Sequence, residues 1–299
     1  MSVSTMITQL CFLICVSVSA QHFNQRITAA DASEKLLGPI NKEALSSTPF
    51  SAWFVSEEAT YAPDDNIVSS LQPNLSEYTI TAFMGTWCGD SKREVPRFYK
   101  ILEAAEFPLD RLQMIALDNE REAYKQSPGG EEEGIGIHRV PTFIIYKDHH
   151  EVGRIVEHPK TSLEADLLAI ISSEPYEPNY PEVTFLMEQL KKQGIQSLIS
   201  NSEKLVPKLA SLTEDIRGLL TYSSVLLYSE EHEAALAVAT LATKVFPKQY
   251  YAYVNLGNKL QYVGKKNDSI KAYEKALELR PDDESLQETI ASLKNNSAH

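Results

Sequence analysis

The last third of the chain repeats its residue types at a fixed interval, and this period constrains the fold more than any other feature. Pro247 and Pro281 lie 34 residues apart, and the same spacing separates Ala242 from Ala276. An interval of this length indicates a stack of helix–turn–helix units, because each unit buries its apolar side against the next. The sequence therefore predicts an all-helical array towards its C-terminal end.

These units resemble the tetratricopeptide repeat family. Residues 250–283 are similar to its consensus at Tyr253, Leu256, Gly257, Tyr273, Ala276 and Pro281. Residues 216–249 keep the alanines and the closing proline, but Ser223 replaces the glycine. We interpret 183–215 as a degenerate helical pair and 216–294 as the repeats with a capping helix. The resemblance implies binding of a protein or peptide partner, or packing on a neighbouring domain, and the sequence leaves both open.

A second pattern surrounds a cysteine in the middle of the chain. The apolar, β-branched run 77–84 predicts a buried strand, and it is followed by Gly85 and the turn WCGDS at 87–91. Helical spacing then appears at Val95, Phe98, Tyr99 and Leu102. We therefore expect Cys88 at a helix N-terminus, where free backbone N–H groups and the helix dipole favour the thiolate over the thiol.

Residues 76–173 resemble the thioredoxin-fold family, with motifs in that family's order. The turn 87–91 follows the strand, Pro96 lies five residues beyond the turn, and Val-Pro-Thr at 140–142 precedes another strand. Glu94, six residues after the cysteine, is similar to the exported TlpA-like branch. The expected fold class is an α/β thioredoxin fold followed by an all-α tetratricopeptide-repeat domain.

The resemblance implies an active site at this turn. In that family the proline equivalent to Pro141 is cis and lies against the reactive sulfur, and the backbone beside it pairs with bound substrate. The implied catalytic residues are Cys88, Ser91, Trp87 and Pro141, and the implied substrate-binding residues are Val140, Arg139 and Thr142. Three further residues are expected to modulate the thiol: Asp90, Lys92 and Glu94. His138 is expected to be an exposed loop histidine or, alternatively, a local base.

Two departures from the family change the expected chemistry. Ser91 replaces the second cysteine, and Ala82 stands where thioredoxins keep a buried aspartate. A thiolate at Cys88 can form a mixed disulfide with a partner protein, but an external thiol reductant must release that partner. Asp90 opposes the thiolate, whereas Lys92 supports it. The alternative is a relic cysteine on a fold that only binds.

The N-terminal segment predicts export. Residues 1–20 contain no charged side chain and end in Val-Ser-Ala, which is typical of a cleaved secretory signal; a buried helix or an anchor is the alternative. Cleavage would remove Cys11 and Cys15 and leave Cys88 as the single thiol of a periplasmic or secreted protein.

Composition limits the remaining options. A net charge of −13 over 299 residues argues against nucleic-acid binding, because no basic surface is available. The seven histidines are scattered, so we expect no metal and no cofactor. Residues 174–182 predict a proline-rich linker, and 21–75 a helical extension laid on the sheet.

Two functions are compatible with these patterns. The first is an exported protein that exchanges disulfides through one cysteine, with the repeats recruiting a thiol- or disulfide-containing partner. The second is a non-catalytic adaptor in which both domains only bind. The reactivity of the thiol distinguishes them.

Overall fold

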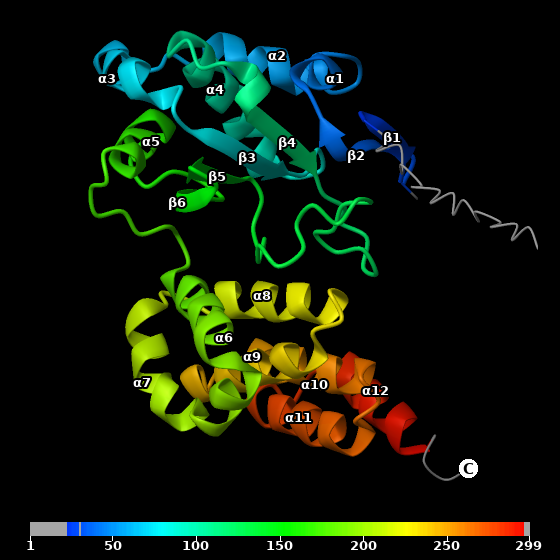
Figure 1. Ribbon diagram of the computed structural model, residues 1–299. Coiled ribbons are helices and arrows are strands. Elements are labelled where there is room, and N and C mark those ends of the chain that lie inside the picture. Colours follow the sequence, from blue (N-terminus) through cyan, green and yellow to red (C-terminus); the bar gives the residue numbers. More distant parts are fainter. Residues whose placement is uncertain (1–22, 30, 296–299) are drawn as a thin grey trace, which may run out of the picture.

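The computed structural model describes residues 23–29 and 31–295, and it places a mixed α/β region before a set of C-terminal helices (Figure 1). We call residues 23–171 the α/β half and 180–295 the helical half. The expected signal at 1–20 lies outside the described residues. Among the described residues, no helix combines the length and the apolar character needed to cross a membrane.

One six-stranded sheet organises the α/β half, in the order β1-β2-β4-β3-β5-β6. Its strands are β1 (Gln25–Thr28), β2 (Glu34–Ile40), β3 (Thr79–Met84), β4 (Leu112–Ala116), β5 (Thr142–Lys147) and β6 (His150–Val156). The central strands β3 and β4 are parallel, and every other pair is antiparallel. The parallel pair brings the ends of β3 and β4 to the same edge, where the cysteine turn begins.

Five helices accompany the sheet, and the longer ones cover one of its faces (Figure 1). They are α1 (Lys42–Leu45), α2 (Ser51–Thr60), α3 (Asp65–Leu75), α4 (Gly89–Ala104) and α5 (Leu163–Ile171). The main core lies between these helices and the sheet, with the ring of Phe98 stacked on that of Phe143 at a centroid distance of 4.1 Å. Alternate strand residues such as Ala82 and Met84 face this core.

The opposite face of the sheet carries a smaller apolar cluster. Phe83, Ile115 and Ile144 form it together with Ile137 and Val140, both from the loop at 117–141 that joins β4 to β5. We call this segment the β4–β5 loop. No helix forms within it, so this face is covered by loop residues and by the helical half beyond them (Figure 1).

The expectation of a helical extension at 21–75 is wrong for its first part. β1 and β2 occupy residues 25–40 and add two antiparallel strands to the sheet, and helices follow only from Lys42. Gly38 and Pro39 within β2 are residue types that argue against a strand, which explains the error. β2 is a strand because its apolar residues, such as Leu36, complete the main core.

The helical half consists of antiparallel neighbours in chain order. Its helices are α6 (Pro181–Ser200), α7 (Ser202–Leu212), α8 (Arg217–Tyr228), α9 (His232–Val245), α10 (Tyr250–Tyr262), α11 (Lys266–Leu279) and α12 (Glu284–Asn295). α6 bends where Gly194 leaves the helical conformation. From α8 onward each helix packs on the next, and α12 covers the end of the array.

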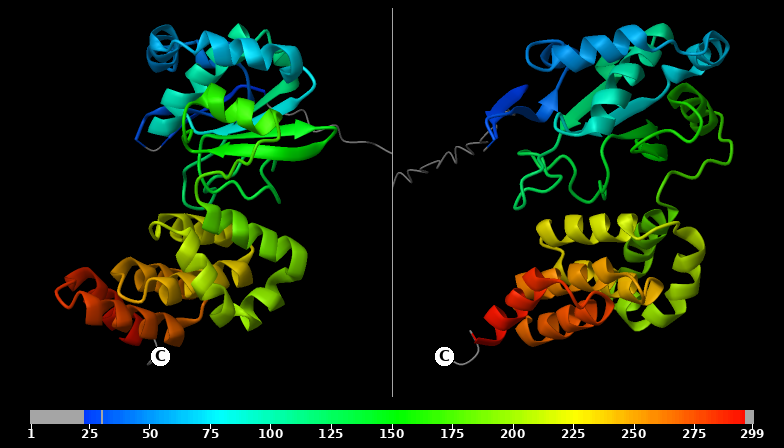
Figure 2. Two further views of the ribbon diagram at one scale, coloured as in Figure 1. Left: turned by 90° about the vertical axis from the view of Figure 1, so that its left-hand side faces the viewer. Right: turned by 180° about the vertical axis from the view of Figure 1, so that it is seen from behind.

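The two halves meet along the β4–β5 loop, which lies between the sheet and α8 in all three views (Figures 1 and 2). Three tyrosines of the helical half supply the contacts. The ring of Tyr180 contacts His138 and Arg139, Tyr222 contacts His138, and Tyr228 contacts Tyr124. The helical half therefore packs on the α/β half, which is one of the two arrangements that the sequence left open.

Candidate functional site

Cys88 lies at the junction of β3 and α4. It is the N-cap residue of α4, with extended backbone angles, and its carbonyl accepts the hydrogen bond from the Lys92 amide at 3.0 Å. The thiol is half-buried and donates to the carbonyl oxygen of Val140 at an S–O distance of 3.2 Å. Strand, turn and helix thus place a free thiol against the backbone of the β4–β5 loop.

Ser91 closes the turn below the thiol. Its side chain is fully buried, and its hydroxyl accepts a hydrogen bond from the Gly85 amide at 3.1 Å. This bond ties the start of α4 to the end of β3. The serine at the second motif position is therefore part of the local structure, and its oxygen cannot replace a sulfur in disulfide exchange.

Trp87 anchors the turn to the sheet. Its indole nitrogen donates to the Leu117 carbonyl at 2.8 Å. One face of the ring meets the Lys125 amine, which lies 5.0 Å from the ring centroid. The indole thus links the cysteine turn to two points of the β4–β5 loop.

The substrate-binding residues expected from the resemblance lie together at the start of β5, and Val140 is the one whose backbone contacts the thiol. The peptide bond between Val140 and Pro141 is cis. Thr142 begins β5, and its hydroxyl donates to the Arg139 carbonyl at 2.8 Å. The Arg139 guanidinium pairs with Glu157 at 3.1 Å and lies 4.7 Å from the ring centroid of Tyr180.

The three expected modulating residues lie in the first turns of α4, but a residue that the motif did not single out pairs with two of them. Arg93 binds Asp90 at 2.9 Å and the buried carboxylate of Glu94 at 2.7 Å. The negative charge of Asp90 is therefore compensated locally, which weakens its expected effect on the thiolate. Lys92 is half-buried in the same turn.

The expectation that His138 is exposed is wrong. Only 4% of its surface is accessible, because Tyr180 and Tyr222 of the helical half pack against its ring. Burial, reinforced by the charge of Arg139, lowers the pKa of His138 to about 3, so the imidazole is neutral at physiological pH. Nε2 has no hydrogen-bond partner among the described residues.

Two residues next to the thiol carried no sequence signal: Tyr124 and Lys125. They lie in an irregular part of the β4–β5 loop, far from the motif in sequence. Burial lowers the pKa of Lys125 to about 8; the interaction with Cys88 opposes this shift, and the repulsion from Arg139 adds to it. The thiol site therefore includes a buried amine that exchanges its proton near neutral pH.

A cavity of about 1470 Å³ opens between the two halves next to this site. Ile137 and His138, just before the cis peptide bond, line one side, and α6 and α8 line the other. Arg154 and Lys191 are outnumbered in its lining by glutamates: Glu122, Glu132, Glu133, Glu151, Glu188, Glu230 and Glu231. This charge disfavours an anionic ligand.

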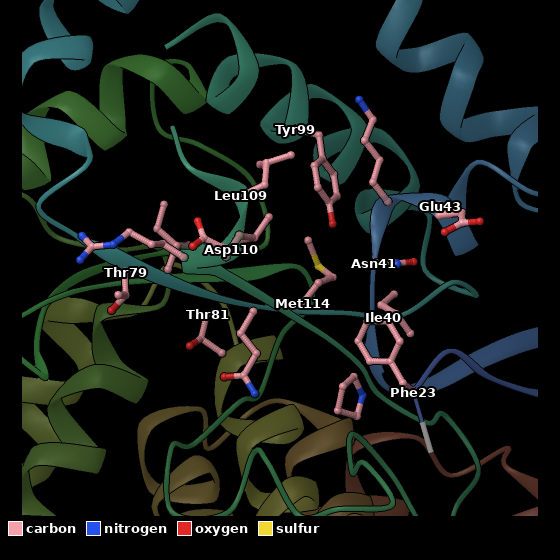
Figure 3. A pocket seen from close by; sticks show the side chains of 16 residues that line it. Phe23, Ile40, Asn41, Glu43, Thr79, Thr81, Tyr99, Leu109, Asp110 and Met114 are labelled. Atoms are coloured by element: carbon pink, nitrogen blue, oxygen red, sulfur yellow. The ribbon is translucent and has the colours of Figure 1, made fainter. Parts of the chain in front are cut away.

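A second pocket, of about 700 Å³, lies at the opposite ends of the central strands (Figure 3). Thr79 and Leu112, at the beginnings of β3 and β4, line it, and Tyr99 and Met114 extend towards each other across it. Since the thiol lies beyond the other ends of β3 and β4, this pocket is separate from the cysteine site.

Comparisons with known proteins add one finding. Residues 250–283, which are α10 and α11 with their flanking turns, match the tetratricopeptide repeat family. α8 and α9 form a preceding helix pair of similar length. A search of curated proteins finds no match. Because tetratricopeptide repeats are protein-interaction units, the helical half supports protein–protein interaction.

Proposed function

We propose that this chain forms mixed disulfides with partner proteins through Cys88, on a thioredoxin fold at 76–173 followed by tetratricopeptide repeats at 216–294. The observation that carries the proposal is the hydrogen bond from the Cys88 thiol to the Val140 carbonyl beside the cis peptide bond. It holds a free, half-buried sulfur at a helix start next to an extended backbone segment. The strand order, with β3 and β4 parallel at the centre, is compatible with the thioredoxin fold.

The proposed reaction is thiol–disulfide exchange. The Cys88 thiolate attacks one sulfur of a partner disulfide, a bond forms between the two sulfurs, and the other partner sulfur leaves as a thiolate that takes up a proton. Ser91 cannot break the new bond. An external thiol therefore releases the partner by attacking the partner's sulfur, and Cys88 leaves as the thiolate.

In this proposal the expected site residues have different roles. Cys88 is the nucleophile, and Trp87 and Ser91 fix the turn that carries it. Val140 and Pro141 present backbone beside the sulfur, and Arg139 and Thr142 hold that segment in place. The repeats would recruit or orient the partner.

Reaction with oxidised glutathione tests the proposal. The mature wild-type chain is expected to form an adduct on Cys88 at pH 7 at least about tenfold faster than the same chain unfolded in urea. Cys88→Ser should form none, and Ser91→Cys should shorten the lifetime of the adduct because the new thiol can resolve it. Equal rates for the folded and unfolded chains would exclude exchange.

A non-catalytic adaptor is the second candidate, and the covered loop favours it. Tyr180 and Tyr222 of the helical half pack on His138, close to the segment that a captured substrate would use. In this case Cys88 would be inert, and partners would be retained by Cys88→Ser as well as by the wild type. Pull-down from the native compartment with both proteins under non-reducing conditions separates the two candidates.

We also propose that the protein is exported to the periplasm or secreted after cleavage behind Ala20, which leaves Cys88 unable to form an intramolecular disulfide. N-terminal sequencing of the exported chain tests this, and a first residue of Gln21 is expected. Retention of residues 1–20 would contradict it.

A further inference from the structure

A buried lysine lies over the ring of Trp87, the residue before the proposed reactive thiol, and no carboxylate of the described chain forms an ion pair with it. Lys125 is 4% exposed and is held in a left-handed backbone conformation, with its amide donating to the Asp118 carbonyl at 2.9 Å. Its amine lies 5.0 Å from the ring centroids of both Trp87 and Tyr124. In the described part of the chain, this amine has neither a carboxylate within ion-pair distance nor a hydrogen-bond acceptor.

Burying an ammonium that has neither a carboxylate nor a hydrogen-bond acceptor is costly, and buried groups with a shifted pKa are concentrated at functional sites. The two aromatic faces recover part of the lost hydration through cation–π interaction. Trp87 is also the neighbour of Cys88 in the motif. The lysine is thus held over the same side chain that anchors the cysteine turn.

We propose that Lys125 is the charge partner of the Cys88 thiolate: its ammonium, held over the Trp87 ring, stabilises the sulfur anion for exchange. This inference rests on the proposed function of Cys88. The thiol proton passes to solvent, and the thiolate and the ammonium then form a pair without net charge. No oxidant or metal takes part.

The electrostatic surroundings of the amine support this assignment. After burial, the interaction with Cys88 has the largest effect on the pKa of Lys125, and it favours the charged amine. Arg139 opposes the charged form, Glu157 supports it more weakly, and the Tyr124 hydroxyl is itself held neutral by burial. Because the interaction between two charges is mutual, an ammonium that is favoured by the thiolate favours the thiolate equally.

The helical half holds the lysine in this position. The Tyr228 hydroxyl of α8 accepts a hydrogen bond from Arg121 at 3.0 Å, and the Gln126 amide group donates to the Tyr228 carbonyl. The Tyr228 ring also meets the edge of Tyr124 at 6.3 Å. Tyr228 of α8 therefore holds loop residues before and after Lys125 in place, although the thiol lies in the other half.

The pH profile of Cys88 alkylation by iodoacetamide tests the proposal in the full mature chain. Lys125→Met keeps the side-chain length and removes the charge, and it should raise the pH midpoint by about one unit and slow alkylation at pH 7 about tenfold. Lys125→Arg keeps a charge over the rings and should restore most of the rate at pH 7. Lys259→Met, which removes a buried lysine of the helical half, is the matched control and should leave the profile unchanged.

Each outcome separates this inference from the function on which it rests. A wild-type thiol that reacts faster than in the urea-unfolded chain, with an unchanged profile in Lys125→Met, would overturn the lysine assignment and leave the exchange function intact. A wild-type thiol that reacts no faster than in the unfolded chain would overturn both. A shift of the pH profile in Lys259→Met without a shift in Lys125→Met would also contradict the assignment.

A second measurement avoids dependence on the folding of Lys125→Met. Reductive ¹³C-methylation gives each lysine an NMR signal whose position follows its protonation. If the thiolate stabilises the Lys125 ammonium, Cys88→Ser should lower the pH midpoint of the Lys125 signal, and the Lys259 signal should not move. An unchanged Lys125 midpoint in Cys88→Ser would overturn the proposal.

Discussion

Within the described residues, each half of the molecule buries one lysine without a carboxylate partner, but the two surroundings differ. Lys259 of α10 is 3% exposed, and its amine donates to the Ser224 hydroxyl at 3.0 Å and to the Asn255 side-chain oxygen. Lys125 of the α/β half faces two aromatic rings and the thiol instead. Neutral oxygens satisfy Lys259, which joins α8 to α10, whereas the Lys125 amine has no bonded acceptor among the described residues.

This difference shows how a buried lysine with a structural role can be distinguished from one with a role in a functional site. Burial lowers the pKa of both lysines, to about 7 for Lys259 and about 8 for Lys125. For Lys259 burial is the sole cause, while for Lys125 the charge of Arg139 adds to the lowering and the interaction with Cys88 opposes it. A perturbed pKa alone therefore does not identify a functional residue, but an acceptor-free amine beside a nucleophile does suggest one.

The halves also differ in how they fill their cores, and the largest predicted effect comes from the α/β half. Phe143→Ala removes a ring that is 1% exposed and stacked on Phe98, so it should destabilise this half by about 3–5 kcal/mol. Both tryptophans, Trp53 and Trp87, lie in the α/β half, so urea unfolding followed by fluorescence reports on it alone.

The control for this prediction is Val152→Ala, at an exposed position of the neighbouring strand β6, which should have little effect. Circular dichroism at 222 nm follows the helices of both halves. If the helical signal shifts by the same amount as the fluorescence in Phe143→Ala, the halves unfold as one unit and the comparison between two separate cores fails.

In the helical half, small residues permit close packing, and the next largest effect is expected there. A Cβ at Gly257 of α10 would collide with the ring of Tyr273, whose hydroxyl bonds Asn258 and Gln261 at 2.8 Å each. Gly257→Ala should therefore destabilise this half by about 1–3 kcal/mol. The measurement is urea unfolding followed by circular dichroism.

The matched substitution for Gly257→Ala is Gly89→Ala at the start of α4, where a Cβ meets no atom within 4 Å. There, alanine should stabilise by about 0.5–1 kcal/mol, because it restricts the unfolded chain. Opposite signs for the two substitutions are the expected result. Two gains of stability would mean that Tyr273 moves aside freely.

The pH dependence of stability sharpens the comparison of the two lysines. The pKa of Lys259 is lowered in the folded chain, so above pH 7 the unfolded chain binds more protons, and raising the pH favours folding. Between pH 7 and 8, Lys259 should add about 1 kcal/mol to the free energy of unfolding. This increment should disappear in Lys259→Met, measured by urea unfolding at both pH values.

Lys248→Met, at an exposed position between α9 and α10, is the control and should retain the increment. Lys125 titrates in a neighbouring range, but it is present in the wild type and in both variants. The difference between the wild type and Lys259→Met therefore isolates one amine. An equal pH dependence in these two proteins would show that the buried ammonium is better solvated than its surroundings indicate.

The sequence predicted those parts of the fold and site that depend on local pattern. The apolar run before Cys88 and the helical spacing after it were sufficient to place the thiol at the start of α4. The period of 34 residues predicted the repeat at 250–283, and the family comparison confirms it. Both signals lie within short segments, where strand, turn and helix preferences act on neighbouring residues.

Features that depend on distant contacts could not be predicted. His138 was expected to be exposed, and it is buried because two tyrosines from the other half pack on it. Lys125 lies in a loop without periodicity, and only the folded chain brings it to Trp87. β2 was missed because its glycine and proline are unfavourable in strands, while its partner β4 lies more than 70 residues further on.

The smallest predicted effect concerns the contact that joins the two halves. Tyr228→Phe removes only the hydroxyl that accepts from Arg121, on a partly exposed pair, so it should destabilise the folded chain by about 0.5–1 kcal/mol. The Tyr228 backbone carbonyl still binds Gln126, and the ring still meets Tyr124. Alkylation of Cys88 should therefore remain within about twofold of the wild type, because the loop that carries Lys125 stays fixed.

Tyr228→Ala is the informative companion, because it removes the ring as well. Without the contact to Tyr124, one of the two aromatic faces around the Lys125 amine loses its support from α8. Alkylation at pH 7 should then be slower than in Tyr228→Phe and faster than in Lys125→Met. The charge of Lys125 is still present in Tyr228→Ala, but its position is less well fixed. If Tyr228→Ala and Tyr228→Phe alkylate equally fast while Lys125→Met is slow, the lysine is held by its own half. The repeats would then contribute partner binding without shaping the thiol site.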